Sequence, residues 1–175
     1  MRLIGLDPGL THTGWGIIDV NGVHIRHVAH GVLSTNTKAA LAARLLELHD
    51  GLGRVIAEFN PDEAAVEETF VNKNPVSTLK LGQARGVVML APAEAGLPVA
   101  EYLPNLVKKS IVGSGHAQKD QVIMMVETLL PGVGPLKADA ADALAVAICH
   151  AHFRQTNSKI AAAESGARRR GARVQ

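Results

Sequence analysis

A two-residue turn signal, Asn21-Gly22, separates two apolar stretches near the start of the chain. Asn-Gly between apolar runs is typical of a tight β-hairpin, because both central residues of the favoured turn adopt a positive φ. The first apolar run closes in a turn of its own at Pro8-Gly9. These signals predict three consecutive antiparallel strands over residues 2–7, 14–20 and 23–33.

After these strands the chain alternates between helical and extended patterns. Apolar residues recur at spacings of three and four between residues 38 and 59, which predicts a helix that ends before Asn60-Pro61. The later pattern predicts strands over 64–66 and 97–102 and helices over 75–91, 117–130 and 138–153. Such an order favours an α/β fold in which a mixed β-sheet is flanked by α-helices on both faces.

The chain has 175 residues, of which 47% are hydrophobic, enough for one continuous core. We therefore expect one folded domain over residues 1–153. Residues 158–175 contain a single acid, Glu164, and five basic residues: Lys159, Arg168, Arg169, Arg170 and Arg173. This composition predicts a basic, disordered tail over residues 154–175, with at most a non-specific electrostatic role.

The sequence shows no sign of export or membrane insertion. It has no run of about 18 uncharged apolar residues, the length that a membrane span requires. The first apolar run meets Asp7 and a turn too soon for a signal peptide. The lone cysteine, Cys149, excludes an intrachain disulfide and a cysteine-rich zinc site. We expect a cytoplasmic protein.

Four acidic residues stand where a mixed sheet can bring them together. Asp7 ends the first predicted strand and Glu67 the fourth, while Asp139 and Asp142 lie three apart on one face of the last helix. If that helix packs across the two strand ends, the four carboxylates converge. They would repel one another unless cations neutralised them, and hard oxygen ligands suit Mg²⁺ or Mn²⁺. Two such ions about 4 Å apart can activate water and stabilise the leaving oxygen in phosphodiester hydrolysis.

Each acid also has a purely structural interpretation. Asp7 can be a turn residue, Glu67 a surface strand end, and Asp139 an acid that interacts with the helix dipole. Asp142 is harder to explain in this way, because the segment ADAADALAVAICHAHF is apolar nearly all round and offers no obvious solvated face. An ionised carboxylate buried there without a partner would be costly.

The turn after the first strand supports a second functional hypothesis. Asp7 is followed by Gly9, Thr11 and Gly14, a spacing that resembles the first phosphate loop of the actin, heat-shock ATPase and sugar-kinase superfamily. Such a protein would be a nucleotide-binding phosphotransferase. That superfamily closes two related domains over the nucleotide and uses a second phosphate loop, for which we find no counterpart in the sequence.

Basic residues predominate between Thr69 and Lys119, where only Glu94 and Glu101 are acidic. This imbalance is typical of a surface that binds a polyanion, although a solvated face can have the same composition. The candidate DNA-binding side chains in this segment are Lys73, Lys80, Arg85, Lys108, Lys109 and Lys119.

Two residues in this segment have a more specific interpretation. Phe70 follows the predicted Glu67 strand in a polar loop, where an exposed ring can stack on an unpaired base with about 1–3 kcal/mol; alternatively it folds back onto the body. Lys119 begins a predicted helix after Gly115, where its ammonium and the backbone N–H groups can bind phosphate; alternatively it is a solvated helix lysine.

The histidines do not form an obvious metal triad. Strict alternation along residues 23–33 places His24 and His30 on one face of the strand and His27 on the other.

Three segments resemble the RuvC family of bacterial Holliday junction resolvases, which are RNase H-like nucleases. They are MRLIGLDPGLTHTGWGI, AVEETFVNKNPVSTLKLGQARGVV and ADAADALAVAICH, and they occur in the family's order between residue 1 and about residue 153. The resemblance implies an RNase H-like fold and an endonuclease that resolves four-way DNA junctions in recombination and repair. No motif of the family matches residues 154–175.

The resemblance also implies roles for individual residues. In that family the metal ions are bound by carboxylates that match Asp7, Glu67, Asp139 and Asp142. Some relatives carry His at the position of Asp139, so its role is the least rigid of the four. The aromatic residue that matches Phe70 acts at the junction crossover, and basic residues that match Lys108 and Lys119 assist DNA binding or catalysis. We accordingly expect two Mg²⁺ ions per site, replaceable by Mn²⁺, with Asp7 bridging them and Lys119 contributing to catalysis.

The expected substrate implies an assembly. Resolving a junction takes two nicks, while the chain contains one carboxylate quartet, so we expect a twofold homodimer. The partner implied by the resemblance is the RuvA and RuvB branch-migration complex. A third hypothesis, a junction-binding protein with an inactive site, is disfavoured by the intact quartet.

Overall fold

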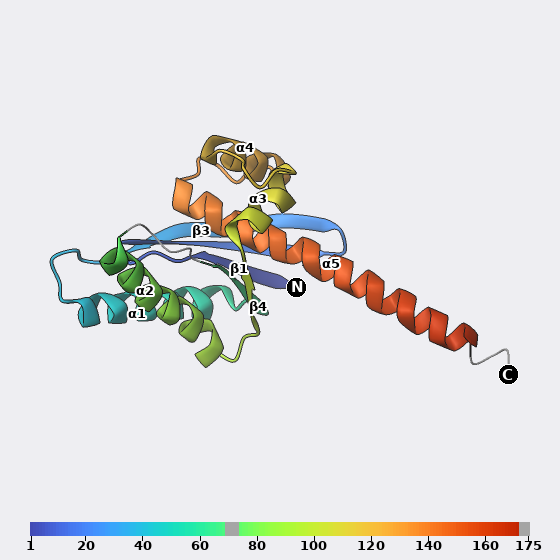
Figure 1. Ribbon diagram of the computed structural model, residues 1–175, viewed down its shortest axis with the longest axis horizontal. Coiled ribbons are helices and arrows are strands. Elements are labelled where there is room, and N and C mark those ends of the chain that lie inside the picture. Colours follow the sequence, from blue (N-terminus) through green and yellow to red (C-terminus); the bar gives the residue numbers. More distant parts are fainter. Residues whose placement is uncertain (69–73, 172–175) are drawn as a thin grey trace.

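The computed structural model describes residues 1–68 and 74–171, with side chains described as far as Thr156 (Figure 1). Most elements lie near their predicted bounds, and one helix, α3, was not predicted. The elements are β1 (Arg2–Asp7), β2 (His12–Asn21), β3 (His24–Ser34), α1 (Leu41–Phe59), β4 (Glu63–Glu67), α2 (Pro75–Glu94), β5 (Val99–Tyr102), α3 (Pro104–Val112), α4 (Lys119–Leu129) and α5 (Ala138–Gly171).

The five strands form one mixed sheet in the order β3-β2-β1-β4-β5. β1, β2 and β3 pair antiparallel, whereas β4 pairs parallel with β1 and with β5. Helices α1 and α2 cover one face, and α5 crosses the other with α3 and α4 packed against it (Figure 1). The predicted mixed sheet with helices on both faces is therefore confirmed.

Alternation along β1 assigns its side chains to two separate cores. Leu3 packs in the core beneath α5, while Ile4 and Leu6 pack in the core formed with α1 and α2. Because side chains alternate between the faces of a strand, Gly5 and Asp7 share the α5 side with Leu3.

The same alternation holds along β4, where Ala65 faces α5 and Ala64 and Val66 face α1 and α2. Glu63 and Glu67 therefore lie on the α5 face, at opposite ends of the strand.

Glycines under α5 bring this helix against the backbone of the sheet. A Cβ added to Gly5 would lie 2.1 Å from the carbonyl oxygen of Ala143, and one added to Gly14 would lie 1.9 Å from that of Asp139. No real side chain fits at such distances. The first turn of α5, with its acids, is consequently held beside the end of β1.

The unpredicted helix α3 is only nine residues long. Its local signals are Pro104 in the first turn and Gly113 at the end, where φ is +81°. Val107 and Ile111, four apart, are its buried residues. A helix of this length depends on tertiary packing for its stability, which explains why its pattern was too short to recognise.

Helix α5 is longer than predicted. It continues past Phe153 through the basic segment to Gly171. Alanine and arginine, which are frequent in this segment, are good helix formers, so a composition that suggested disorder is compatible with a helix. The domain boundary at residue 153 and the disorder of the tail both stay predictions. Within the described part of the chain, no helix is both long and apolar enough to span a membrane.

The predicted arrangement of the strand histidines is wrong. The register of β2 and β3 shifts between Ile17, opposite Ala29, and Ile18, opposite His27. This bulge interrupts the strict alternation. His27 and His30 consequently lie side by side, with Nε2 of the first 2.9 Å from Nδ1 of the second.

Candidate active site

Asp7 and Glu67 lie side by side at the ends of two neighbouring strands. In the parallel pair β1 and β4, Leu6 is opposite Val66, so the next residues of both strands emerge at the same edge of the sheet. The two side chains are close enough to interact, because the charge of Glu67 contributes to the raised pKa of Asp7.

The first two turns of α5 bring the other two acids to this edge. Asp139 lies in the first turn, directly above Gly14 of β2, and Gly14 is opposite Asp7 in the sheet. Asp142 follows one turn later, and its Oδ2 lies 3.8 Å from Nζ of Lys119 at the start of α4. The sequence therefore predicted correctly that the last helix crosses the ends of the two strands.

The pKa values show that these carboxylates interact. Burial, and then the charges of Glu67, Asp142 and Asp139, raise the pKa of Asp7 to about 8. Burial and the charge of Asp142 raise the pKa of Glu67 to about 7. Burial also raises the pKa of Asp142, and Asp139 adds to the rise while Lys119 opposes it. Four acids crowded in this way favour any species that neutralises their charge, whether a proton or a cation.

Two lysines from separate helices face the carboxylates. Lys119, on α4, lowers the pKa values of Asp7, Glu67 and Asp142, and Lys108, on α3, lowers those of Glu67 and Asp142. Both residues were predicted from sequence, although the helix that positions Lys108 was not.

The other predicted basic residues are more scattered. Lys109 is exposed on the last turn of α3, and Lys80 is exposed on α2. Arg85, also on α2, pairs with Glu101 of β5, so its charge already has a partner. Phe70 and Lys73 lie outside the described residues.

The donor set fits a hard divalent cation, because four carboxylates supply only oxygen ligands. Within residues 1–68 and 74–156, no three His, Cys, Asp or Glu side chains already stand in metal-binding geometry. The fit therefore rests on the chemistry of the donors and on their mutual repulsion, which a cation would relieve.

Packing accounts for the small residues of the turn between β1 and β2. Thr13 is fully buried, and its Oγ1 donates to the carbonyl of Gly9 at 2.6 Å. A Cβ on Gly9 would lie 2.0 Å from the carbonyl oxygen of His12, and Gly14 is covered by α5. These glycines are required by the tight turn and by the helix above it, so the hypothesis of a nucleotide phosphate loop is not needed to explain them.

A buried polar network, which the sequence analysis missed, ties the middle of α5 to the sheet. Nδ1 of His150 lies 2.8 Å from the Tyr102 hydroxyl, and its Nε2 lies 3.0 Å from Oε2 of Glu63. Arg154 pairs with the same glutamate. In the sequence, the feature that could have revealed this network is Glu63, an acid next to the buried run of β4. The network fixes α5 along β4 and thereby helps to place the acids at its N-terminal end.

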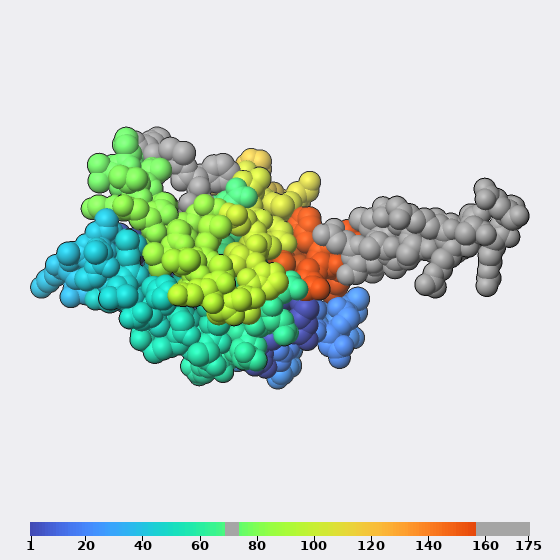
Figure 2. All heavy atoms as spheres, turned by 90° about the horizontal axis from the view of Figure 1, so that it is seen from below, coloured from blue at the N-terminus to red at the C-terminus, as the bar shows by residue number. Residues whose placement is uncertain are grey.

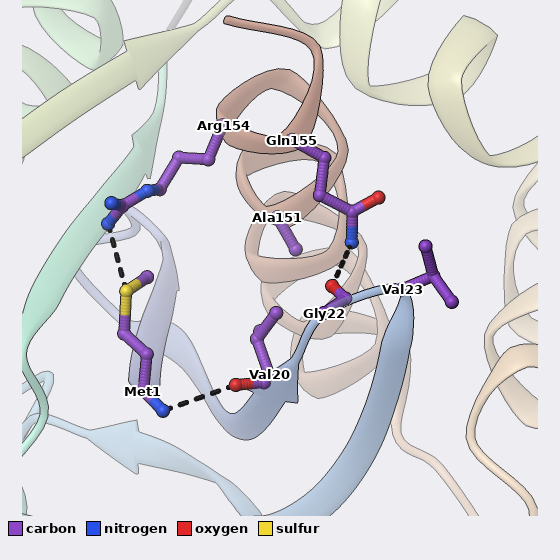
Figure 3. Close-up of a pocket in the computed structure, with 7 residues that line it drawn as sticks. All are labelled: Met1, Val20, Gly22, Val23, Ala151, Arg154 and Gln155. Atoms are coloured by element: carbon purple, nitrogen blue, oxygen red, sulfur yellow. Dashed lines mark hydrogen bonds between the residues drawn. The ribbon is translucent and has the colours of Figure 1, made fainter. Parts of the chain in front are cut away.

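A separate cavity of about 390 Å³ lies at the other end of the sheet (Figure 3). Met1, Val20 and Ala151 contribute to its mainly apolar lining, and Gln155 donates to the carbonyl of Gly22 at 2.6 Å. Because Met1 and Asp7 flank opposite ends of β1, this cavity is distinct from the carboxylate cluster.

The sequence matches one family over most of its length. The family model described as Crossover junction endodeoxyribonuclease RuvC matches residues 3–150. The protein of that name from Paramagnetospirillum magneticum is 67% identical over 163 residues, which cover 93% of this chain and 98% of that protein. The one from Rhodospirillum rubrum is 63% identical over 166 residues, which cover 95% and 98%.

Solved structures show the same likeness. Thermus thermophilus RuvC in complex with a Holliday junction substrate matches with a TM-score of 0.83 at 36% identity, over 90% of this chain and 96% of that one. The yeast mitochondrial Holliday junction resolvase is 14% identical and matches with a TM-score of 0.63, over 90% of this chain and 81% of that one. The second match shows a shared fold alone. Together they confirm the predicted RNase H-like fold.

Proposed function

Because the chain belongs to the RuvC family of crossover junction endodeoxyribonucleases, we propose that it resolves four-way DNA junctions by making two symmetric nicks. The observation that carries this proposal is the cluster of Asp7, Glu67, Asp139 and Asp142 where β1, β4 and α5 meet. A carboxylate quartet on this fold is suited to metal-dependent phosphodiester hydrolysis. The Thermus thermophilus relative was solved with a Holliday junction, which supports the same substrate class for this chain.

Family members are metal-dependent nucleases, and we assign two Mg²⁺ ions, replaceable by Mn²⁺, to the four carboxylates. Such a pair would supply an activated water and stabilise the departing oxygen. Asp7 would be the ligand shared by both ions, because it interacts with Glu67 and with the two α5 acids.

Lys119 and Lys108 contribute positive charge to the site, whereas the carboxylates would bind the metal ions. The ammonium group of Lys119 faces Asp142, and Lys108 faces the same cluster from α3. Positive charge at this position can hold a DNA phosphate against a site that would otherwise repel it. We propose that Lys119 acts directly on the scissile phosphate and that Lys108 assists in binding.

Cleavage should require Mg²⁺ or Mn²⁺, whereas Ca²⁺ should support junction binding without efficient cleavage. Mg²⁺ demands a stricter octahedral geometry than Ca²⁺, which adopts larger and more variable coordination shells. The measurement is nicking of a labelled four-way junction in each cation, with a linear duplex of matched sequence as control. Efficient nicking in EDTA would refute the metal-dependent mechanism, and equal cleavage of the linear duplex would refute junction selectivity.

We also propose that the enzyme works as a homodimer that uses α2. One face of this helix exposes large apolar side chains at Val76, Leu79 and Leu90, which are 60%, 65% and 56% exposed. Gly82 and Gly86 on the same helix have nothing within 4 Å of an added Cβ, so a second helix can approach closely there. An exposed apolar face of this kind suits a second copy of the chain, which supplies the second active site.

The sedimenting species should have twice the 18.4 kDa mass of the chain. Leu79→Glu should raise the dissociation constant of the dimer about 100-fold or more, because a charge buried without a partner in the interface is costly. Leu46→Glu is the matched control, since Leu46 is 60% exposed but lies on α1. Analytical ultracentrifugation over a dilution series measures both effects. A wild-type protein that is monomeric while it resolves junctions would contradict the proposal, and an undisturbed Leu79→Glu dimer would exclude α2 as the interface.

Three further expectations extend this proposal. Stacking of Phe70 at the junction crossover stays a prediction, because this residue lies outside the described part of the chain. The branch-migration complex of RuvA and RuvB is the partner that family membership suggests. An enzyme acting on chromosomal junctions would work in the cytoplasm.

A further inference from the structure

A polar groove of about 280 Å³ lies beside the turn that follows β1. It is formed where the first turns of α2 pass α1, on the face of the sheet opposite α5. Figure 2 shows α1 and α2 side by side on this face. The groove is lined by Leu10, Thr11, Arg44, Ser77, Lys80 and Leu81. None of these residues belongs to the carboxylate site.

Arg44 is held rigidly at one wall of the groove. Its Nε donates to Oγ1 of Thr35 at 2.9 Å, and its Nη2 donates to Oγ1 of Thr11 at 3.1 Å and to the carbonyl of Leu10 at 3.2 Å. All three acceptors are neutral. Among the described residues no carboxylate pairs with Arg44 and no acceptor binds its Nη1, so the guanidinium keeps its full charge and a free donor edge.

Lys80 extends into solvent from the opposite wall, and it forms no ion pair within the described chain. The backbone N–H of Ser77 is already bound by the Asn74 side chain, so Ser77 can offer only its hydroxyl. The lining thus combines two cationic side chains with two hydroxyl groups and contains no acid. This combination suits a phosphate, to which Arg presents paired donors and Lys a mobile charge.

We propose that the groove between Arg44 and Lys80 binds one backbone phosphate of the DNA, outside the catalytic carboxylates. Leu10 and Thr11 follow Asp7 by only three and four residues, so the groove lies near the edge of the sheet at which the carboxylates gather. Because Arg44 also bonds this turn, a phosphate bound there would hold the DNA and the segment after Asp7 in one fixed relation. This inference rests on the proposed function and names a second contact for the same substrate.

The test measures junction affinity by fluorescence anisotropy with the full-length protein, in Ca²⁺ and over a series of salt concentrations. Lys80→Gln and Arg44→Gln should each weaken binding several-fold and reduce the slope of log K against log salt by about 0.9, the value for one lost phosphate contact. Arg54→Gln is the control for net charge, because Arg54 is exposed on the same helix as Arg44 but lies outside the groove. It should leave the slope unchanged.

The possible results distinguish a failure of the phosphate site from a failure of the proposed function. If the wild type binds and cleaves junctions while Lys80→Gln keeps the wild-type slope, the groove is not a phosphate site and the proposed function stands. If the wild type does not prefer junctions over linear duplex, the proposed function itself fails. Arg44→Gln can also loosen the turn, which a thermal melt would reveal. In that case Lys80→Gln, whose side chain supports no other element, decides.

Discussion

Asp7→Asn should reduce junction cleavage by about three orders of magnitude, equivalent to about 4 kcal/mol in the activation barrier. The substitution preserves the size of the side chain but removes the charge at the centre of the carboxylate cluster. Junction affinity should stay the same or rise slightly, because one negative charge near the DNA is lost and the basic contacts remain. Single-turnover cleavage and gel-shift affinity, compared at one salt concentration, measure the two effects.

Asp50→Asn provides the control for Asp7→Asn. Asp50 is exposed on α1, so its replacement changes the net charge equally without touching the cluster. Cleavage by Asp7→Asn at the wild-type rate would refute the metal site proposed here. Loss of cleavage in Asp50→Asn as well would mean that the effect arises from net charge.

Asp7→Asn should also melt at a higher temperature than wild type in EDTA near pH 8. The folded-state pKa of Asp7, about 8, lies above its ordinary value of 3.8. A raised carboxyl pKa favours the folded state at low pH, and this contribution is lost as the pH rises from about 4 towards 8. Asn does not titrate and avoids that loss. Mn²⁺ should raise the melting temperature of wild type but not that of Asp7→Asn, because only the wild-type site binds the ion.

Gly5→Ala should destabilise the fold by about 3 kcal/mol or more, which lowers the melting temperature by roughly 6–12 °C in a chain of this size. The added Cβ would lie 2.1 Å from the carbonyl oxygen of Ala143 and 2.6 Å from the backbone nitrogen of Ala147. Both are backbone atoms that cannot move without displacing α5. Thermal denaturation followed by circular dichroism gives the change.

The matched control is Gly53→Ala on α1, where an added Cβ meets nothing within 4 Å. Alanine is the better helix former by about 1 kcal/mol, so this variant should be as stable as wild type or more so. If both variants melted like wild type, α5 would not lie directly on the backbone of β1.

The sequence alone determined the elements whose signals are local. Alternation of period two and the Asn21-Gly22 signal identified the first strands, although Asn21 pairs with His24 and the turn itself is formed by Gly22 and Val23. Spacings of three and four identified α1 and the start of α5. The convergence of the four acids was also predictable, because parallel strands end at one edge of a sheet and residues three apart share one face of a helix. These rules depend only on backbone geometry.

Only the tertiary structure decided the features that depend on contacts between distant segments. The short helix α3 is stabilised by packing against α5, and this packing brings Lys108 to the carboxylates. The bulge that places His27 beside His30 depends on the pairing of β3 with β2. Arg44 is positioned by hydrogen bonds to Leu10 and Thr11, which form only because α1 packs beside the turn after β1. Such contacts depend on how segments fit together in space, and the local periodicity of a chain contains little information about that fit.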